Sequence, residues 1–291
     1  MKTFSKLPQV HEEYTSVTCP VCGSRECKTH WDCGTYSFQR CTCCKHIYQN
    51  PRPRPQDLLD RYDEEYKNYE VENSQNFFQL MIEGLNDVGF LDLEKHIQES
   101  LPPLESPKFL DVGCATGVLV RYMYDRGWDS MGLEVCVPAA EYAQANRGVR
   151  VQVGTLESQE WQWGTYDLIH SSHVIEHVPD PNEYLSLQHK LLKPGGYIIV
   201  TTPNTKSFQA AFMGASWRSA IADHVHLFSR THLGELLVRA GFEPKEWKTW
   251  GGIPLGMAPK GVKRSADWLA KRLGLGDVMI FLAKKPKKSD A

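Results

Sequence analysis

The stretch FLDVGCATG, residues Phe109–Gly117, decides the fold of this chain. It follows a proline-containing break at 101–107 and precedes VLVRYMY, an apolar run with helical spacing. This order predicts a short buried strand, a glycine-containing turn and a helix. Gly113 and Gly117 carry no Cβ, so such a turn lets a bound molecule approach the backbone closely. The turn is a weak signal when it stands alone.

The next predicted strand supports a binding site for a nucleotide-like ligand. Residues 128–135 read as a strand, with Glu134 near its C-terminal end. Glu134 lies about 20 residues beyond the turn, the separation at which a carboxylate accepts hydrogen bonds from both ribose hydroxyls. Gly113, Ala115 and Gly117 are two residues apart, which differs from the G-x-G-x-x-G spacing and argues against a nicotinamide dehydrogenase.

Four motifs together resemble those of class I S-adenosylmethionine (SAM) methyltransferases. They are LDVGCATG, GLE, YDLIHSSHVIEHVPDP (166–181) and KPGGYIIVTTPN (193–204). The resemblance implies an α/β fold with a Rossmann-like, mostly parallel sheet and an antiparallel last strand. Ala115 stands where the family often has a third glycine, and we expect an ordinary turn with negative φ there. The resemblance assigns SAM binding to Asp111, Gly113, Cys114, Gly117, Glu134, Thr155, Leu156 and His170.

The rest of this frame can be placed along the sequence. We expect helices at 138–146, 182–192 and 231–240, and strands at 149–153, 166–171 and 197–202. Residues 242–250 and 277–284 read as two closing strands, which suit the antiparallel hairpin at the end of this fold. Between them, 260–273 reads as a basic amphipathic helix. We favour packing of its Val262, Ala266, Leu269 and Leu273 on the protein's own surface over contact with an anionic membrane or a partner.

Seven of the nine cysteines fall between Cys19 and Cys44, which indicates a metal site. Two C-x2-C pairs, Cys19–Cys22 and Cys41–Cys44, are separated by 18 residues. This spacing matches a four-thiolate zinc ribbon, in which the ion ties two hairpins together in a segment too small for its own core. Gly23 permits the tight turn after the first pair. We predict that the ligands are Cys19, Cys22, Cys41 and Cys44.

Other interpretations of the cysteine cluster remain open. Cys27 and Cys33 are left over, and Cys43 could replace Cys41 only by breaking the x2 spacing. His30 or His46 could substitute as a ligand. A set of reduced structural cysteines, or an iron–sulfur cluster, would also account for the composition.

Asn50–Pro55, NPRPRP, predicts a stiff boundary because each proline fixes φ and restricts the preceding residue. We therefore expect a zinc ribbon and linker at 1–55, a helical segment roofing the site at 56–105 and a SAM-binding domain at 106–291. Six basic and two acidic residues between Cys19 and Arg54 are an excess that a solvated face can carry. We favour a structural cap over an RNA reader.

Histidines supply the candidate catalytic groups. His173 follows the strand predicted at 166–171, where the methyl group of SAM should point, and we assign proton removal to it. His224 and His226 alternate in a segment that follows an insertion, so only one of them needs to face the pocket and bind the acceptor.

The same region contains a metalloprotease-like order of residues. His173, Glu176 and His177 match H-x-x-E-H. We reject a catalytic metal here because the motif follows a strand instead of lying on a long helix. We expect His177 to hold the loop through hydrogen bonds.

Composition bounds the function. A hydrophobic content of 41% and a charged content of 23% suit a globular protein, and a net charge of −2 argues against a whole-surface nucleic-acid binder. No transmembrane stretch or signal core is visible, so we expect a cytoplasmic protein with reduced cysteines.

We predict a SAM-dependent methyltransferase of a small molecule, either sugar-containing or quinone-like. The alternatives are an RNA methyltransferase that reads with its ribbon and a non-catalytic binding module. The acceptor atom and the oligomeric state stay open.

Overall fold

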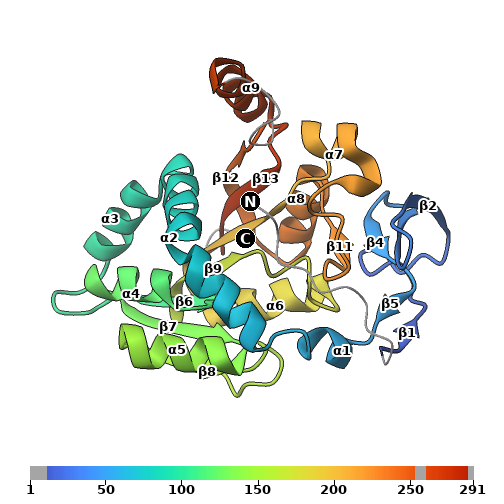
Figure 1. Ribbon diagram of the computed structural model, residues 1–291. Helices are drawn as coiled ribbons and strands as arrows, with labels where there is room; N and C mark the ends of the chain where they lie inside the picture. Colours follow the sequence, from blue (N-terminus) through green and yellow to red (C-terminus); the bar gives the residue numbers. More distant parts are fainter. Residues whose placement is uncertain (1–11, 253–259, 288–291) are drawn as a thin grey trace.

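The computed structural model describes residues 12–252 and 260–287, apart from the side chains of Lys260 and Val262. A central sheet carries helices on both faces, and a smaller sheet lies to one side of it (Figure 1). Residues 1–11, where a signal core was looked for in the sequence, lie outside the described residues. Among the described residues, no helix combines the length and apolar character that crossing a membrane requires.

The central sheet has seven strands in the order β12-β13-β10-β9-β6-β7-β8. Its parallel part is formed by β6, β7, β8, β9 and β10, and β13 runs antiparallel to both β10 and β12. This confirms the predicted fold class. The strands are β6 (Lys108–Val112), β7 (Asp129–Glu134), β8 (Val151–Val153), β9 (Tyr166–Ser172), β10 (Leu192–Pro203), β12 (Glu243–Trp250) and β13 (Val278–Lys284).

Alternating side chains of the strands build two cores. Leu110 of β6 packs with the helices of one face, α6 (Pro181–Leu191) and α8 (Arg230–Arg239). Phe109 packs on the other face with α2 (Glu64–Asp87), α3 (Phe90–Ser100) and α4 (Val118–Asp125). Both faces of the sheet are therefore covered, which is why its strands are nearly continuous apolar runs. A further helix, α5 (Val137–Arg147), packs its alanines against α4 and β8.

One strand boundary differs from the prediction. A helix was predicted at 182–192 and the next strand only at 197–202, but β10 already begins at Leu192 and pairs there with Tyr166 of β9. A register shift between Leu192 and Tyr197 absorbs the proline and glycines. A bulge of this kind lets a strand accommodate residues that interrupt regular pairing.

The ribbon is not a separate unit. Its strands β2 (Cys27–Asp32), β3 (Ser37–Cys41) and β4 (Ile47–Gln49) form a four-stranded sheet with β11 (His226–Leu227), which comes from the far end of the chain. Two short strands, β1 (Tyr14–Thr15) and β5 (Arg52–Pro53), pair next to it, and α1 (Pro55–Leu59) leads toward α2. The segment before β11 contains α7 (Phe208–Met213) and a 3-10 turn, η1 (Gly214–Ser216).

The basic helix α9 (Lys260–Leu273) is present as predicted, but it packs differently. Ala270 is fully buried against β12, and its carbonyl oxygen accepts a hydrogen bond from the Thr249 hydroxyl. Leu269 and Leu273 are 42% and 55% exposed, so the expected apolar face is only partly covered. A small residue at the contact lets the helix approach the strand closely, and the longer side chains then project past its edge.

Candidate active site and metal centre

A cavity of about 840 Å³ opens where the carboxyl ends of β6, β7 and β9 meet. This edge is the usual ligand-binding position of open α/β sheets, and the volume suits a cofactor together with a small acceptor. Tyrosines Tyr62, Tyr66 and Tyr69 of the segment before and within α2 line it from above. These three aromatic side chains therefore form part of the cavity wall.

The glycine turn after β6 fits a cofactor cradle. Gly113 has φ of +75°, and an added Cβ would come 2.4 Å from a methyl carbon of Val174. Only glycine therefore fits this position without displacing its neighbour. Asp111, Cys114, Thr155 and Leu156, which are also predicted to bind SAM, line the same cavity.

Of the other two predicted SAM contacts, His170 lines the cavity and Gly117 does not. Gly117 begins α4 and is held by packing, because a Cβ there would meet the side chains of Ala143 and Val149 at 2.9 Å. His170 lines the cavity, and its Nδ1 lies 2.7 Å from Asp111 Oδ1. The other ring nitrogen, Nε2, is buried without a hydrogen-bond partner among the described residues. A buried orphan nitrogen beside a cradle is a position that a ligand donor can satisfy.

Ala115 corrects one prediction. Its φ is +45°, in the left-handed region, and not negative as expected. Its N–H donates to Glu134 Oε2 at 2.8 Å, and that bond to a buried carboxylate holds the conformation. Alanine in this region costs roughly 1–2 kcal/mol, so the turn accepts local strain to keep the backbone amide on the acid.

Glu134 ends β7 and faces the turn. Its two oxygens accept hydrogen bonds from the N–H groups of Ala115 and Cys136, each at 2.8 Å. Burial raises the pKa of Glu134, whereas these bonds to its ionised form oppose that shift. The carboxylate retains lone pairs toward the cavity that it lines, so it fits a ribose diol.

Glu134→Ala is expected to weaken SAM binding by about 1.5–3 kcal/mol, because hydrogen bonds to a charged acceptor are lost. Calorimetric titration of the purified protein measures this change. Glu141→Ala, at an exposed position on α5, is the matched control and should bind SAM normally. Unchanged affinity in the Glu134 variant would refute the assignment.

A histidine–glutamate pair stands at the end of β9. The His173 Nδ1 atom lies 3.0 Å from Glu176 Oε1, and the other Glu176 oxygen accepts from the Thr202 hydroxyl at 2.8 Å. The Glu176 side chain is 1% exposed, whereas that of His173 is 46% exposed and reaches the cavity. With Nδ1–H on the carboxylate, His173 Nε2 carries a lone pair.

The backbone and electrostatics strengthen this pair. His173 has φ of +56°, a strained value for a non-glycine residue, and its N–H donates to Thr201 O at 2.9 Å. Burial alone would raise the pKa of Glu176, but the hydrogen bond from His173 and the nearby His224 and His177 rings outweigh it and lower the pKa to about 2. Glu176 is therefore ionised and keeps the imidazole in one tautomer.

His177 and His224 face the same cavity. His177 Nδ1 lies 2.9 Å from the carbonyl oxygen of Asp223, so this ring holds the loop as expected. His224 Nδ1 lies 2.8 Å from Ser219 O, which fixes its tautomer and leaves Nε2 as an acceptor. Burial and the neighbouring His177 ring lower the pKa of His224 to about 3, so it stays neutral.

Glu176, His177 and His224 bring ligand atoms within 4.8 Å of one another, a set that could hold a metal ion. Both Glu176 oxygens already accept hydrogen bonds, from His173 and Thr202. The H-x-x-E-H residues lie in a turn and not on a long helix. We therefore keep the interpretation of this group as a hydrogen-bonded acceptor site.

His226 is not among the side chains that line the cavity. Its ring is fully buried, with Nδ1 3.1 Å from His46 Nε2 and Nε2 3.0 Å from Val178 O. The alternation predicted from the sequence thus directs His224 to the cavity and His226 to the ribbon contact. The structure gives His226 no position from which to touch an acceptor in this cavity.

The buried, neutral His224 predicts acid sensitivity. Its pKa of about 3 in the folded state lies below the ordinary value near 6.5, so between these values the unfolded chain binds the extra proton. Stability should therefore fall as pH drops below about 6.5, with a slope of up to roughly 1.4 kcal/mol per pH unit from this group. Glu176 contributes a further loss of stability only below about pH 4.5, where its carboxylate becomes protonated in the unfolded chain but stays ionised in the folded protein.

Denaturant unfolding between pH 6.5 and pH 5 measures this slope. His224→Gln should make the curve shallower in that window, whatever its effect on absolute stability. His96→Gln, at an exposed position on α3, is the control and should leave the slope unchanged. Equal slopes in all three proteins would contradict the burial of a neutral His224.

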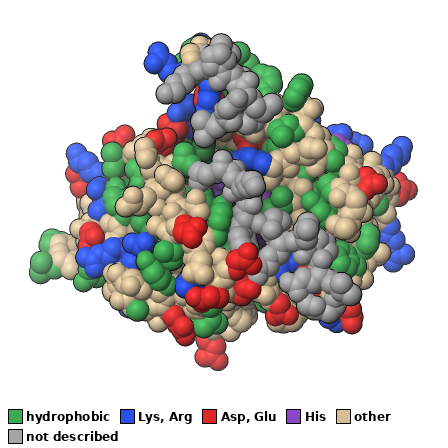
Figure 2. All heavy atoms as spheres, in the orientation of Figure 1, with side chains coloured by type: hydrophobic (Ala, Val, Ile, Leu, Met, Phe, Trp, Pro, Cys, Tyr) green, Lys and Arg blue, Asp and Glu red, His purple; other side chains and the backbone are tan. Residues whose placement is uncertain are grey.

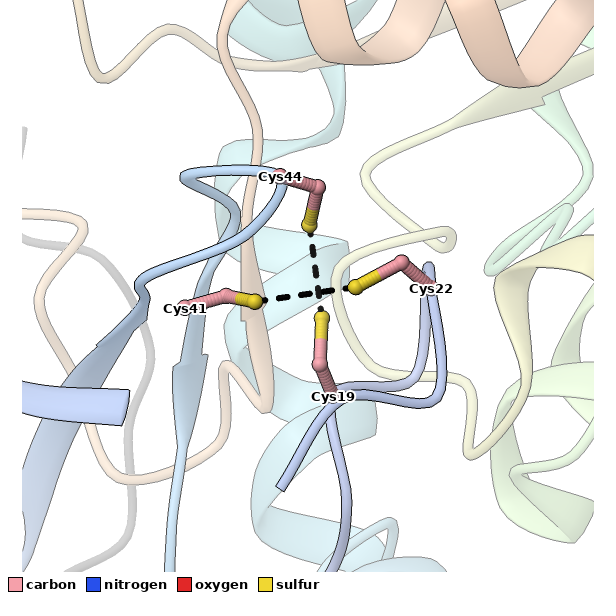
Figure 3. Close-up of side chains that lie close together, drawn as sticks. All are labelled: Cys19, Cys22, Cys41 and Cys44. Atoms are coloured by element: carbon pink, nitrogen blue, oxygen red, sulfur yellow. Dashed lines mark hydrogen bonds between the residues drawn. The ribbon is translucent and has the colours of Figure 1, made fainter. Parts of the chain in front are cut away.

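The predicted cysteines converge on one point (Figure 3). Cys19 and Cys44 Sγ atoms lie 3.5 Å apart, those of Cys22 and Cys41 lie 3.6 Å apart, and all four sulfurs are within 4.8 Å. A tetrahedral zinc ion with Zn–S bonds of about 2.3 Å separates its sulfurs by about 3.8 Å. The cluster therefore fits zinc with a small adjustment.

Each C-x2-C pair forms the same tight turn. The N–H of Gly23 donates to Cys19 O at 2.8 Å, and the N–H of Lys45 donates to Cys41 O at 3.1 Å. Gly23 has φ of +74° and Lys45 has φ of +66°, so a lysine occupies a position that favours glycine. The remaining candidates lie elsewhere: Cys43 is exposed, Cys33 Sγ contacts Ala215 O, and His46 binds His226.

The ribbon that holds the metal centre is connected to the active site through backbone hydrogen bonds. β4 pairs with β11, and the N–H groups of Val225 and His226 both donate to the carbonyl oxygen of Glu176, at 2.9 and 3.0 Å. The catalytic domain also holds both cysteine turns. His232 Nε2 lies 2.7 Å from Cys44 O, Arg239 donates to Val21 O at 2.9 Å, and Asn182 donates to Pro20 O at 2.7 Å.

Sequence reasoning assigned no role to Glu176, which binds His173, or to Glu70, which lines the cavity. Glu176 stood inside a quoted motif, and its distance of three residues from His173 was the available signal. Glu70 lines the cavity from α2, and burial, followed by the charge of Glu134, raises its pKa to about 7. Nothing in the local pattern distinguishes Glu70 from the exposed acids around it.

The family comparison covers the core of this site. Residues 89–246, more than half of the chain, match the family described as "Methyltransferase domain". The ubiquinone biosynthesis O-methyltransferase of Bordetella avium is 31% identical over 161 residues, covering 51% of this chain and 67% of that protein. The enzyme of the same name from Acinetobacter baylyi is 34% identical over 130 residues, or 42% and 55% of the two chains. The chain thus spans about two thirds or less of these relatives.

Solved structures agree at the level of the fold. A methyltransferase of Haloferax volcanii, in complex with the Trm112 methyltransferase activator, is similar with a TM-score of 0.54 at 16% identity, over 76% of this chain and 97% of that chain. An S-adenosylmethionine-dependent methyltransferase from Listeria monocytogenes has a TM-score of 0.50 at 13% identity, over 66% and 97%. With the glycine cradle, Glu134 and the family match in place, the chain belongs to the methyltransferase domain family and is a SAM-dependent methyltransferase.

Proposed function

We propose that this enzyme methylates a hydroxyl group on an aromatic, quinol-like small molecule. The observation that carries the proposal is the His173–Glu176 pair, which presents an imidazole base inside the same cavity as the SAM cradle. The curated relatives, named for ubiquinone biosynthesis, are O-methyltransferases and support an oxygen acceptor. Aromatic side chains Tyr62, Tyr66 and Phe77 line the cavity and suit a flat ring.

We assign cofactor binding to the glycine turn and its partners. Gly113 admits the cofactor to the backbone, Glu134 accepts from the ribose, and the orphan Nε2 of His170 accepts an N–H of its amino-acid end. When bound, SAM supplies an electrophilic methyl group on a sulfonium. Thr155 and Leu156 flank the cavity on the β8 side and would contact the adenine.

We assign the proton transfer to His173. Its Nε2 takes the hydroxyl proton of the acceptor as the oxygen becomes nucleophilic, and ionised Glu176 stabilises the imidazolium that forms. His224 Nε2 accepts a hydrogen bond from a second polar group of the acceptor and so orients it. The tyrosine roof excludes water and holds the ring in line with the methyl group.

A panel of acceptors tests the proposal. The zinc-loaded protein is incubated with SAM and with catechols, quinols, deoxysugars and a short RNA, and formation of S-adenosylhomocysteine is measured. Turnover of catechols or quinols alone is expected. Turnover of only the sugars or only the RNA would overturn the acceptor class, and absence of turnover with SAM bound would favour a binding module.

The RNA alternative is not favoured by the surface. Figure 2 shows acidic and basic side chains interspersed over this face, without a broad basic area. The net charge of the whole chain is −2. Binding to RNA depends on a concentrated positive surface, which this side of the molecule does not offer.

We further propose a reducing compartment, consistent with cytoplasm. The nine cysteines are free thiols, and four of them form the metal cluster, which requires thiolates. The division into ribbon, helical roof and catalytic domain at residues 55 and 105 also stays a proposal.

A further inference from the structure

A second cavity, of about 220 Å³, lies between the ribbon and the catalytic domain. One wall comes from the ribbon, including Trp31 of β2 and Arg40 of β3. The opposite wall comes from α7, the residues before it and the start of α8. The cavity shares no lining residue with the larger cavity of the methyl-transfer site. Along α7, Gln209 lines the larger cavity, whereas Ala210 and Ala211 line the smaller one.

Basic side chains dominate the lining. Arg40 and Lys45 come from the ribbon and Lys206 from the catalytic domain, together with His30 and His232. No Asp or Glu is among the lining residues. Within 12–252 and 260–287, no carboxylate forms an ion pair with Arg40 or Lys206, and the Lys45 ammonium donates to the backbone oxygen of Thr42. The cavity is therefore lined by three cationic side chains, Arg40, Lys45 and Lys206, and by no acidic side chain.

His30 lies close to two of these cations. Burial lowers the pKa of His30, and Arg40 and Lys206 lower it further. Two cations from opposite walls of the cavity therefore act on the same ring, and a bound anion would relieve the repulsion.

The scaffold holds these groups in place. Lys45 follows Cys44 in the left-handed turn of the metal centre, and His232 is bonded to Cys44 O. Ser229 lines the cavity and caps α8, a helix of 10 residues, so the positive end of that helix adds to the field. Trp31, Ile47 and Ala210 give the cavity an apolar side.

We propose that this cavity binds the phosphate group of a small phosphorylated molecule, with the apolar side packing against its organic part. Three cations and a helix N-terminus exceed what one carboxylate needs, and they match a dianion with several acceptor oxygens. The volume admits a small molecule and leaves no extended groove for a polymer. The proposal is independent of the acceptor class proposed above.

Isothermal titration of the full-length, zinc-loaded protein with phenyl phosphate, pyrophosphate and inorganic phosphate tests this. Benzoate and phenol serve as ligands that lack the dianion. The phosphates should bind, phenyl phosphate most tightly, and Arg40→Gln with Lys206→Gln should weaken them at least about tenfold. Both positions are exposed, so the double variant leaves the core intact.

The control variant is Arg25→Gln with Lys28→Gln. Lys28 stands directly opposite Arg40 on the neighbouring strand, and neither control residue lines the cavity. The control variant removes two positive charges, as the test variant does, but both come from the ribbon. It should bind phosphates within about twofold of the unchanged protein. An equal loss in both variants would mean general attraction to a basic surface and would overturn the site.

Two further outcomes also count against the proposal. The first is no binding of any phosphate at millimolar concentration. The second is tighter binding of a short single-stranded RNA than of every small phosphate, with loss in the control variant as well. The latter would identify the ribbon as a nucleic-acid surface.

Discussion

Replacing His173 with alanine is expected to lower kcat by roughly 10²–10⁴, the contribution of a positioned general base. His173 is bonded to Glu176 and presents its other ring nitrogen to the cavity. The expected loss falls on turnover, because we assign SAM binding to Gly113, which follows β6, and to Glu134, which ends β7. SAM affinity should stay within about twofold, since the substitution removes no cofactor contact.

The partner acid gives a second, graded test. Glu176→Gln keeps the size of the side chain but removes the charge that stabilises the imidazolium, and it should lower kcat less than His173→Ala. The pH dependence distinguishes a base from a structural residue: kcat should rise with pH in the unchanged enzyme and become flat in His173→Ala. His224→Ala should mainly raise the KM for the acceptor.

The outcome that would reverse these roles is specific. If His173→Ala turns over normally and His224→Ala is inactive, the base is His224. If both variants stay active, the acceptor loses its proton without a protein base, and positioning alone carries the reaction.

Removing the metal ligands is expected to have the second large effect. Cys19→Ser with Cys41→Ser takes one residue from each pair of the four-thiol cluster and should abolish zinc binding. Structural zinc contributes roughly 10–16 kcal/mol of binding free energy to small zinc domains, so the ribbon should lose its fold. Cys43→Ser, in the same turn but exposed, is the matched control and should retain one zinc per chain.

Zinc loss should then reach the catalytic residues. The ribbon pairs through β4 with β11, and the N–H of His226 in β11 holds the Glu176 carbonyl together with the N–H of Val225. Turnover should therefore fall about tenfold or more, as when catalytic groups are misplaced, while SAM binding changes little. Metal analysis and calorimetry measure the two quantities. Full zinc occupancy in the double variant would disprove the ligand set, and a second equivalent of metal in the unchanged protein would indicate occupancy at Glu176, His177 and His224.

The sequence by itself determined the frame of the protein. FLDVGCATG followed by Glu134 predicted the turn and its acid, because a glycine turn and a strand-end carboxylate are local features with a fixed separation. The two C-x2-C pairs predicted four sulfurs that the structure brings together, because the spacing of each pair already defines a tight turn. The sequence also predicted the two closing strands, and they pair antiparallel as β12 and β13, as the resemblance implied.

Only the tertiary structure decided which polar groups meet. His226 turned to the ribbon because β11 pairs with β4, which brings its ring to His46, 180 residues away in the sequence. The His173–Glu176 pair is local, but Glu176 is held in place by Thr202 and by the N–H groups of Val225 and His226. The positive φ of Ala115 follows from a hydrogen bond to Glu134 that no local propensity encodes. Contacts of this kind depend on chain segments that pack together from far apart, so residue spacing along the sequence carries no record of them.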